Sequence, residues 1–426
     1  MIRIFIGTLL ALLSVSAALA DTKLIYAGTL YAVPGQDPLR EQTIVVRDGK
    51  IAGVSPGYVR PSAGVTVIDL RNQFVLPGLI DCHVHILNEL GPKSKLQTVE
   101  DSDAMLALRG ALHAWRTLRA GFTTVRDLGE RSGAIFALRR AINEGMVAGP
   151  RLVVAGSTIT PTGGHAQTYG YREDINALFA SSGVCDGVED CRRAVRLQVS
   201  RGADVIKIVA TGGVLSDIKA GVEQQFTDDE MASIVKTAHS LGRKVAAHAH
   251  GAGGLNAALR AGVDSIEHGS YLDSDSISMF RRSGAYLVPT VIAGVTAAQY
   301  AKIGDFLSAA QKAKALLVGP QIQAALKKAY LGGVKIAFGT DSGVSPHGQN
   351  AKEFTLMTGA GMSPVEALRA ATVNAAELLD LSAVIGTIEI GKAADIIAVP
   401  EDPLRDIKVM ERVGFVMRSG AVYLQR

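Results

Sequence analysis

Two pairs of histidines are spaced so that their side chains converge. His83 and His85 follow one apolar run, and His248 and His250 close another. In a β-strand, residues two apart project from the same face, so the two imidazoles of each pair point the same way. Converging imidazoles are a common arrangement for binding a metal ion. Because His-x-His also arises by chance and in structural roles, the pairs alone do not decide the chemistry.

Lys207 lies inside the apolar run Val205–Val209, in which each of the other four residues is β-branched. Burying a charged ammonium group among such side chains costs free energy. The lysine therefore needs either a partner or a changed chemical state. The alternative interpretation is a lysine whose head group reaches solvent at the strand end or forms an ordinary ion pair.

Three further polar residues follow apolar runs. His268 comes after the run 263–267, and Asp341 comes shortly after the run 334–338. His165 ends the loop 160–165, in which two glycines allow the backbone to approach a ligand closely. His165 is therefore a candidate for contacting a substrate, although a plain turn explains the two glycines equally well.

These polar residues belong to a pattern of apolar runs that alternate with helical stretches. The runs lie at residues 75–82, 123–126, 152–155, 205–210, 245–248, 263–267, 286–291 and 334–338. Eight β/α units predict an α/β fold of the TIM (β/α)8 barrel type, in which chemistry lies at the carboxyl ends of the strands. A doubly wound sheet is the rival, but no Gly-x-Gly-x-x-Gly follows the first run.

The intervening helices carry their own signals. The segment 227–230 is a capping box, and the segment 363–366 places a cap, a proline and a glutamate in order. His113 and His239 lie within amphipathic helices, which indicates surface or core roles. His347 lies in a loop, and its role is left undecided.

Both ends of the chain have a β character instead. Residues 24–76 and 385–426 contain short β-like runs and no long helical period. Asp48-Gly49 stands between two such runs and predicts a hairpin.

The composition excludes several classes of function. The chain has 426 residues, 44 of them basic and 40 acidic, and its formal net charge is +4. This balance has no signature of nucleic-acid or membrane-surface binding. Aromatic residues make up 5% of the chain, which argues against stacking platforms for bases. The length allows one large domain or two ordinary ones.

Residues 1–20 resemble a secretory signal peptide. Arg3 precedes the apolar stretch 4–13, and Ala18-Leu19-Ala20 has the small-x-small pattern of a cleavage site. A membrane anchor is the alternative, but the apolar stretch is shorter than the roughly 20 residues that a span needs. We therefore expect cleavage near Ala20 and an exported protein, periplasmic or secreted, with no membrane association after cleavage.

An oxidising compartment would allow cysteines to pair. Cys185 and Cys191 lie six residues apart in a loop-like stretch, and the spacing leaves a disulfide between them open. Cys82 is interpreted as a buried free thiol.

Together these stretches resemble the amidohydrolase superfamily over nearly the whole chain. The resemblance rests on Leu76–His85, Lys207, His248, Ile266–Gly269, Gly339–Asp341 and Gly386–Asp395. It implies a TIM barrel with a small β-sandwich domain built from both chain ends. The implied boundaries are 1–20 for the signal peptide, 21–76 and 382–426 for the β-sandwich, and 77–381 for the barrel.

The resemblance also implies a binuclear metal site. His83, His85 and Asp341 would bind one divalent ion, His248 and His268 the other, and Lys207, carboxylated by CO2 on its amine, would bridge both. Zinc is the metal expected for this mixture of nitrogen and oxygen ligands. His248 and His250 face the same way, and the family pattern favours His248 as the ligand, which leaves His250 to contact substrate.

In such a site, two metals lower the pKa of a bound water and polarise the scissile carbonyl. Asp341 would act as general base and then as general acid towards the leaving amine. His165 would hold a substrate carboxylate or the developing oxyanion.

Within the superfamily, the chain looks most similar to Xaa-amino-acid dipeptidases, carboxypeptidase-like members and the bacterial amidohydrolases that hydrolyse ochratoxin A. This implies a small amide or dipeptide substrate with a free carboxylate, and a homo-oligomer, often an octamer in such families. A cyclic-amide hydrolase of the imidazolonepropionase kind is the nearest alternative. Deamination is disfavoured because the deaminases of this superfamily generally lack the lysine that Lys207 supplies. The alternative outside enzymes is an exported binding protein that retains a relic metal site.

Overall fold

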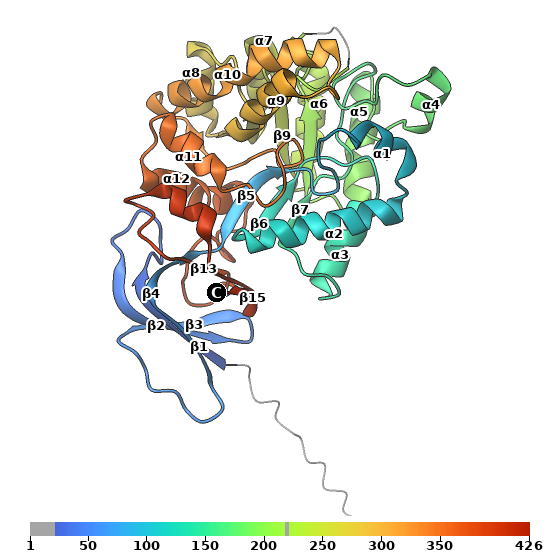
Figure 1. Ribbon diagram of the computed structural model, residues 1–426. Helices are drawn as coiled ribbons and strands as arrows, with labels where there is room; N and C mark the ends of the chain where they lie inside the picture. Colours follow the sequence, from blue (N-terminus) through green and yellow to red (C-terminus); the bar gives the residue numbers. More distant parts are fainter. Residues whose placement is uncertain (1–21, 218–220) are drawn as a thin grey trace, which may run out of the picture.

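The computed structural model describes residues 22–217 and 221–426, which form a sheet built from both chain ends and a larger α/β part (Figure 1). The predicted signal segment, residues 1–20, lies outside the described residues. Among the described residues, no helix has both the length and the apolar character needed to cross a bilayer.

The chain ends form one seven-stranded sheet in the order β15-β14-β13-β4-β1-β2-β3. The strands are β1 (Thr22–Leu30), β2 (Leu39–Arg47), β3 (Lys50–Pro56), β4 (Thr66–Pro77), β13 (Ile396–Val399), β14 (Phe415–Arg418) and β15 (Ala421–Gln425). The predicted hairpin at Asp48-Gly49 joins β2 to β3 and is confirmed. Both turn residues have positive φ, 50° and 77°, as a tight hairpin turn requires.

One face of this sheet packs against itself. Ile25, Ile44, Ile68 and Phe415 come from four different strands and belong to one buried cluster. Because the cluster draws on strands from β3 to β14, the sheet must curve around it. The resemblance predicts a β-sandwich here. The described strands of both chain ends form one continuous seven-stranded sheet, because β4 pairs with both β1 and β13.

In the described α/β part, eight parallel strands follow the order of the chain in two sheets, β5-β6-β7 and β8-β9-β10-β11-β12. The strands are β5 (Leu79–Val84), β6 (Phe122–Asp127), β7 (Arg151–Val154), β8 (Val205–Val209), β9 (Lys244–Ala249), β10 (Ser265–His268), β11 (Tyr286–Val288) and β12 (Lys335–Ile336). Backbone hydrogen bonds connect the two sheets at both edges. The Ile159 amide donates to the Lys207 carbonyl (2.8 Å), and the Cys82 amide donates to the Phe338 carbonyl (2.8 Å).

Helices lie outside these strands (Figure 1). They are α1 (Ser94–Glu100), α2 (Asp103–Arg119), α3 (Ala134–Asn143), α4 (Glu173–Leu178), α5 (Val188–Ser200), α6 (Asp228–Ser240), α7 (Ala252–Ala261), α8 (Ser274–Ser283), α9 (Val291–Ile303), α10 (Ala309–Leu331), α11 (Lys352–Gly359), α12 (Pro364–Ala370), α13 (Val373–Leu378) and the 3-10 helix η1 (Ile407–Arg412). Both predicted helix starts are confirmed. Thr227 and Glu230 form a capping box, and Ser363 caps α12 with Pro364 in its first turn.

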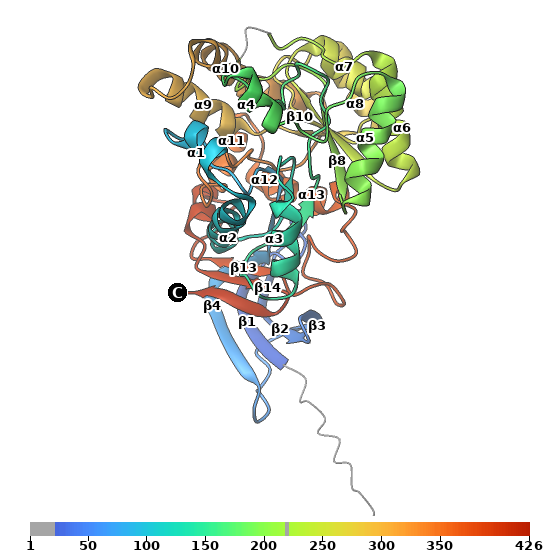
Figure 2. The same cartoon turned by 90° about the vertical axis from the view of Figure 1, so that its right-hand side faces the viewer.

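The first predicted run, 75–82, is divided between the two parts of the molecule. β4 ends at Pro77 beside β13, and β5 begins at Leu79 beside β6. Between them, the Gly78 amide donates to the Asp395 carbonyl (2.8 Å). All of the run 75–82 is largely apolar, so its composition does not indicate where the chain stops pairing with β13 and begins to pair with β6. The C-terminal strands lie between the N-terminal strands and the α/β part (Figure 2).

Cys185 and Cys191 form a disulfide, with their Cα atoms 4.9 Å apart. The bond joins the start of α5 to the loop before it, which resolves the pairing that the sequence left open. Cys82 is a buried free thiol, as predicted.

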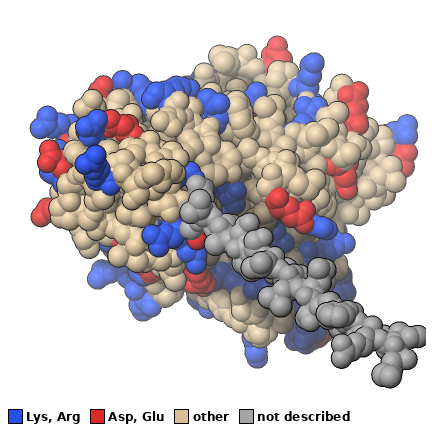
Figure 3. All heavy atoms as spheres, turned by 90° about the horizontal axis from the view of Figure 1, so that it is seen from below, with Lys and Arg blue, Asp and Glu red and all other residues tan. Residues whose placement is uncertain are grey.

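Basic and acidic side chains are interspersed on the face of the molecule shown in Figure 3. Exposed residues of opposite sign form ion pairs, for example Arg71 with Asp69 and Arg412 with Glu401. This mixture matches the near balance of 44 basic and 40 acidic residues in the sequence.

Candidate active site

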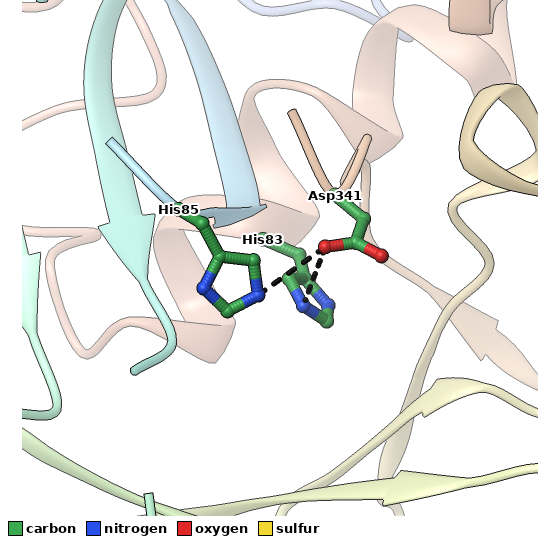
Figure 4. A group of neighbouring side chains, drawn as sticks. All are labelled: His83, His85 and Asp341. Carbon is green, nitrogen blue, oxygen red and sulfur yellow. Dashed lines mark ion pairs between the residues drawn. The ribbon is translucent and has the colours of Figure 1, made fainter. Parts of the chain in front are cut away.

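His83, His85 and Asp341 meet at the carboxyl ends of two neighbouring strands (Figure 4). His83 belongs to β5, His85 follows that strand, and Asp341 follows β12. The Nε2 atoms of His83 and His85 lie 3.4 and 3.3 Å from the same oxygen of Asp341, Oδ1. Two imidazole nitrogens and a carboxylate oxygen at this spacing could hold a metal ion.

Three further imidazoles pack beside this group. The ring of His268, the last residue of β10, lies 5.1 Å from that of His83, 4.7 Å from that of His248 and 5.0 Å from that of His250, measured between centroids. The ring of His165 lies 4.3 Å from that of His248. The six histidines that the sequence singled out therefore form one continuous cluster.

All eight predicted site residues line a single cavity of about 1300 Å³. They are His83, His85, His165, Lys207, His248, His250, His268 and Asp341. Parallel strands present their carboxyl ends on the same side of a sheet. This is how His83 and Asp341, which are 258 positions apart in the sequence, come to lie together. No predicted site residue lies elsewhere.

Three of the seven described non-glycine residues with a left-handed backbone lie at or next to this cavity. His268, Thr290 and Asp341 adopt left-handed φ values of 72°, 52° and 55°. For residues other than glycine, such a conformation costs about 1–3 kcal/mol and persists where surrounding contacts enforce it. Strained residues of this kind are frequent at functional sites, and two of the three, His268 and Asp341, line the cavity.

Hydrogen bonds orient the imidazole rings. Nδ1 of His268 contacts Thr290 Oγ1 (2.7 Å), and Nδ1 of His250 contacts Ser270 Oγ (2.7 Å). Nδ1 of His85 contacts the Gly129 carbonyl (2.9 Å). In each of these rings Nε2 is left to face the cavity. His248 differs, because its Nε2 lies 3.3 Å from the Gly212 carbonyl.

Burial and neighbouring charges shift the pKa values in the cavity. Burial lowers the pKa of His248 and of His268 well below the ordinary value, and it lowers the pKa of His83 to about 4. Burial also lowers the pKa of Lys207 to about 8.

Burial would lower the pKa of His85, but the hydrogen bond and charge of Asp341 raise it to about 9. Burial would raise the pKa of Asp341, but the neighbouring His83 and His85 lower it to about 2. Neutral imidazoles and an ionised carboxylate are the forms that coordinate metals.

His165 sits on the loop after β7 and is held by neighbouring loops. Its Nδ1 lies 2.5 Å from Ser216 Oγ, and its amide donates to Gln225 Oε1 (2.9 Å). A Cβ atom on Gly213 would lie 2.2 Å from the imidazole ring, so only glycine allows this approach. Lys314 on α10 donates to the carbonyls of Gly213 and Ser216 and fixes the same loop.

Two buried charged residues of the site were not assigned roles from the sequence. Glu267 contacts His83 Nδ1 (2.9 Å), and Arg126 contacts Glu267 (2.9 Å). Burial would raise the pKa of Glu267, but Arg126 and His83 lower it to about 2. Arg126 ends the run 123–126, and the cost of burying its charge is a signal of the same kind as that of Lys207.

The undecided His347 has a structural position. Its ring stacks on that of His113 at 4.4 Å, and each ring contacts a backbone carbonyl of the segment after β5, Asn88 and Ile86 respectively. His239 lies at the surface beside Asp264 (2.9 Å). The surface or core roles predicted for His113 and His239 are confirmed.

This fold and this cavity define a class of enzyme. The model of the amidohydrolase family matches residues 74–422, and the chain belongs to this family of hydrolases.

Two relatives match nearly the whole chain. The ochratoxinase of Aspergillus niger is 34% identical over 436 residues, which cover 95% of this chain and 87% of the relative. The crystal structure of A. niger ochratoxinase matches with a TM-score of 0.82 at 31% identity, covering 95% and 96% of the two chains. The crystal structure of a Xaa-Pro dipeptidase with methionine bound in its active site matches with a TM-score of 0.88 at 41% identity, covering 95% and 100%.

A third relative is the imidazolonepropionase of Sphingopyxis alaskensis. It is 25% identical over 385 residues, which cover 83% of this chain and 85% of the relative.

Proposed function

We propose that this protein is a binuclear metal-dependent hydrolase built on a TIM barrel. It cleaves the amide bond of N-acyl or peptidyl amino acids that carry a free carboxylate. The observation that carries the proposal is the convergence of all eight predicted side chains on one cavity. The similarity to an ochratoxinase and to a Xaa-Pro dipeptidase supports an amide of an amino acid as the substrate.

The donor set fits two zinc ions. His83, His85 and Asp341 would hold one, His248 and His268 the other, and Lys207, carboxylated by CO2, would bridge them. Neutral imidazole nitrogens and anionic oxygens are ligands that zinc accepts. A carboxylated Lys207 would also replace the buried ammonium, whose side chain is 4% exposed, by an anionic ligand. When bound, the metals would polarise the scissile carbonyl and lower the pKa of the attacking water.

The reaction also needs a residue that moves protons. Asp341 lines the cavity and its pKa is lowered to about 2, so its carboxylate can accept a proton from the attacking water. As the amide bond breaks, the same carboxyl group would return that proton to the leaving amine. The close contact of Asp341 Oδ1 with His83 and His85 holds the group in place for both steps.

His165 and His250 would bind the substrate. Both rings line the cavity, and both have Nδ1 occupied by a serine hydroxyl, which leaves Nε2 to face a ligand. A donor at this position can hold the substrate carboxylate or the oxyanion that develops at the carbonyl.

Export and self-association belong to the same proposal. Residues 1–20 would direct the chain out of the cytoplasm, and the Cys185–Cys191 disulfide supports an oxidising compartment. Apolar residues exposed along one face of α2 support a homo-oligomer, with an octamer as the state that the resemblance suggests. These residues are Met105, Leu108, Leu112 and Trp115.

The experiment is a substrate screen with matched variants. N-acyl amino acids and dipeptides that vary the C-terminal residue, with ochratoxin A included, are tested for release of the free amino acid. We expect release by the wild type, about two zinc ions per chain, and loss of zinc and activity together in Lys207→Ala. Lys236→Ala, a change on the exposed face of α6, should keep both.

Two results would contradict the proposal. A wild-type protein without metal, or full activity in Lys207→Ala, would exclude the binuclear site. Opening of cyclic amides without release of any amino acid from the screen would favour an imidazolonepropionase-like reaction instead.

A further inference from the structure

A closed network of hydrogen bonds lies beneath His83 in the interior of the α/β part. Arg126 on β6 donates from Nη2 to Glu267 Oε1 (2.9 Å), and Glu267 Oε2 contacts His83 Nδ1 (2.9 Å). Arg126 also donates from Nε to the Cys82 carbonyl (2.6 Å), so the network begins and ends on β5. Arg126 is 1% exposed and Glu267 is fully buried.

The network determines which nitrogen of His83 carries the proton. An ionised carboxylate can only accept hydrogen bonds, so the contact with Glu267 requires a proton on His83 Nδ1. The lone pair of Nε2 is then free on the side of Asp341. This is the tautomer that a metal ion at Nε2 needs.

Arg126 and Ser265 occupy the other oxygen of Glu267. Ser265 Oγ donates to Oε1 (2.6 Å), as Arg126 does, so Oε2 is left for the histidine. Buried ion pairs contribute little net stability compared with apolar residues of the same size. A gain in stability therefore does not explain why Arg126 and Glu267 are buried beside His83.

We propose that Arg126 and Glu267 are positioning residues that hold His83 as its Nδ1–H tautomer, with Nε2 directed at the metal ion. Arg126 fixes the backbone of Cys82 and the carboxylate of Glu267 at once, and thereby sets both the position and the ring orientation of the next residue. This inference rests on the metal-binding role proposed for His83.

The test uses the asymmetry of a glutamine side chain. In Glu267→Gln, the guanidinium of Arg126 accepts no hydrogen bonds, so it forces the amide oxygen towards itself and the amide nitrogen towards His83. His83 must then give up its Nδ1 proton and adopt the wrong tautomer. We expect zinc affinity, measured by competition with a chelator, to fall about 10–100-fold.

Removing Arg126 as well should reverse the defect. In the double variant Arg126→Met with Glu267→Gln, the amide is free to turn its oxygen towards His83, and zinc affinity should recover towards the wild-type value. This double variant also leaves no unpaired buried charge, so it tests the proposal even where the single variant does not fold. Arg126→Met with Glu267→Met, which offers no acceptor at all, should bind zinc about 10–100-fold more weakly than the wild type.

The control is another ion pair of low exposure. Asp395 pairs with Arg151 at 2.8 Å outside the cavity, and Asp395→Asn should lower stability but leave zinc affinity unchanged. The absorption spectrum of the cobalt-substituted protein gives a second readout. The spectrum of Glu267→Gln should differ from that of the wild type, and the spectrum of Arg126→Met with Glu267→Gln should again resemble that of the wild type.

The outcomes separate the two proposals. Wild-type protein that binds no zinc would overturn the metal site and with it the proposed function. If the wild type binds zinc but the two double variants bind it equally well, the metal site stands and the positioning role of Arg126 and Glu267 is wrong.

Discussion

At the scale of the residue, single hydrogen bonds set the ring orientations of His248 and His250. They are two positions apart at the end of β9, and both line the cavity. His250 Nδ1 is held by Ser270, whereas His248 contacts the Gly212 carbonyl through Nε2. The spacing of the two residues in the sequence could not distinguish a ligand from a substrate contact. Their hydrogen bonds give them different orientations.

We expect the two histidines to differ on substitution. His248→Ala should lose about half of the bound zinc, because one of two metal positions loses a ligand. His250→Ala should keep its zinc but lose about tenfold or more in kcat/KM, equivalent to ~1.4 kcal/mol of transition-state stabilisation. Metal analysis and steady-state kinetics on the same preparations measure both. Equal loss of zinc in the two variants would show that the ligand assignment is wrong.

The residue scale also shows where sequence reasoning stopped short. Lys207 stands out in the sequence because burying a charged group within an apolar run costs free energy. Arg126 has a similar setting after Thr124 and Val125, and the same argument applies to it. Its partner Glu267 lies 141 positions away, so the sequence alone could not show which charge Arg126 meets.

At the scale of the element, buried contacts fix the shape of the loops that follow the strands. Glu353 is fully buried and accepts hydrogen bonds from the amides of Val291 and Ile292 at the start of α9. These amides follow Thr290, whose strained conformation supports His268. Hydrogen bonds to α11 therefore hold the segment after β11 that supports His268.

The stacked pair of His113 and His347 ties α2 to the segment after β5. Burial, followed by the proximity of His113, lowers the pKa of His347 from 6.5 to about 3. A histidine whose pKa is lower in the folded state stabilises the fold above its unfolded pKa, and this stability is lost as pH falls towards the folded pKa. The window is therefore from about pH 6.5 down to about pH 3.

We expect the unfolding free energy of the wild type, relative to His347→Gln, to decrease as the pH falls through this window. The slope should reach at most about 1.4 kcal/mol per pH unit, the value for one proton. Urea unfolding at a series of pH values measures the difference. Lys236→Ala, a change on the exposed face of α6, is the control and should run parallel to the wild type. A difference that does not vary with pH would mean that His347 does not titrate as described.

At the scale of the whole molecule, the two chain ends share one sheet. β13 pairs with β4, and β14 lies against the α/β part, so the segment from β13 to the end of the chain connects the first strands to the rest of the protein. Arg151 on β7 and Asp395 before β13 form an ion pair across this boundary.

The exposed face of α2 leads to a prediction about assembly. Leu108 and Trp115 are 67% and 43% exposed and lie on the same face of the helix. Apolar side chains grouped in this way are typical of a contact with another protein surface. Leu108→Lys combined with Trp115→Lys should reduce the mass measured by light scattering after gel filtration, while zinc content stays unchanged. Ile390→Lys, at another exposed apolar residue, is the control, and an equal effect of both changes would contradict an interface on α2.

The sequence by itself determined the features that depend on near neighbours. Strand periodicity, helix caps and the hairpin at Asp48-Gly49 were predictable because each arises from residues within a few positions of one another. The polar residues after successive strands were predictable as a set, since the carboxyl ends of parallel strands lie together.

Only the tertiary structure decided the contacts between distant segments. The division of the run 75–82 depends on β13, which lies more than 300 positions later, and the ring orientation of His83 depends on Glu267, 184 positions away. The stacking of His113 on His347 is of the same kind. Such contacts follow from how whole elements pack, and no local pattern of residues specifies which partner each buried polar group will meet.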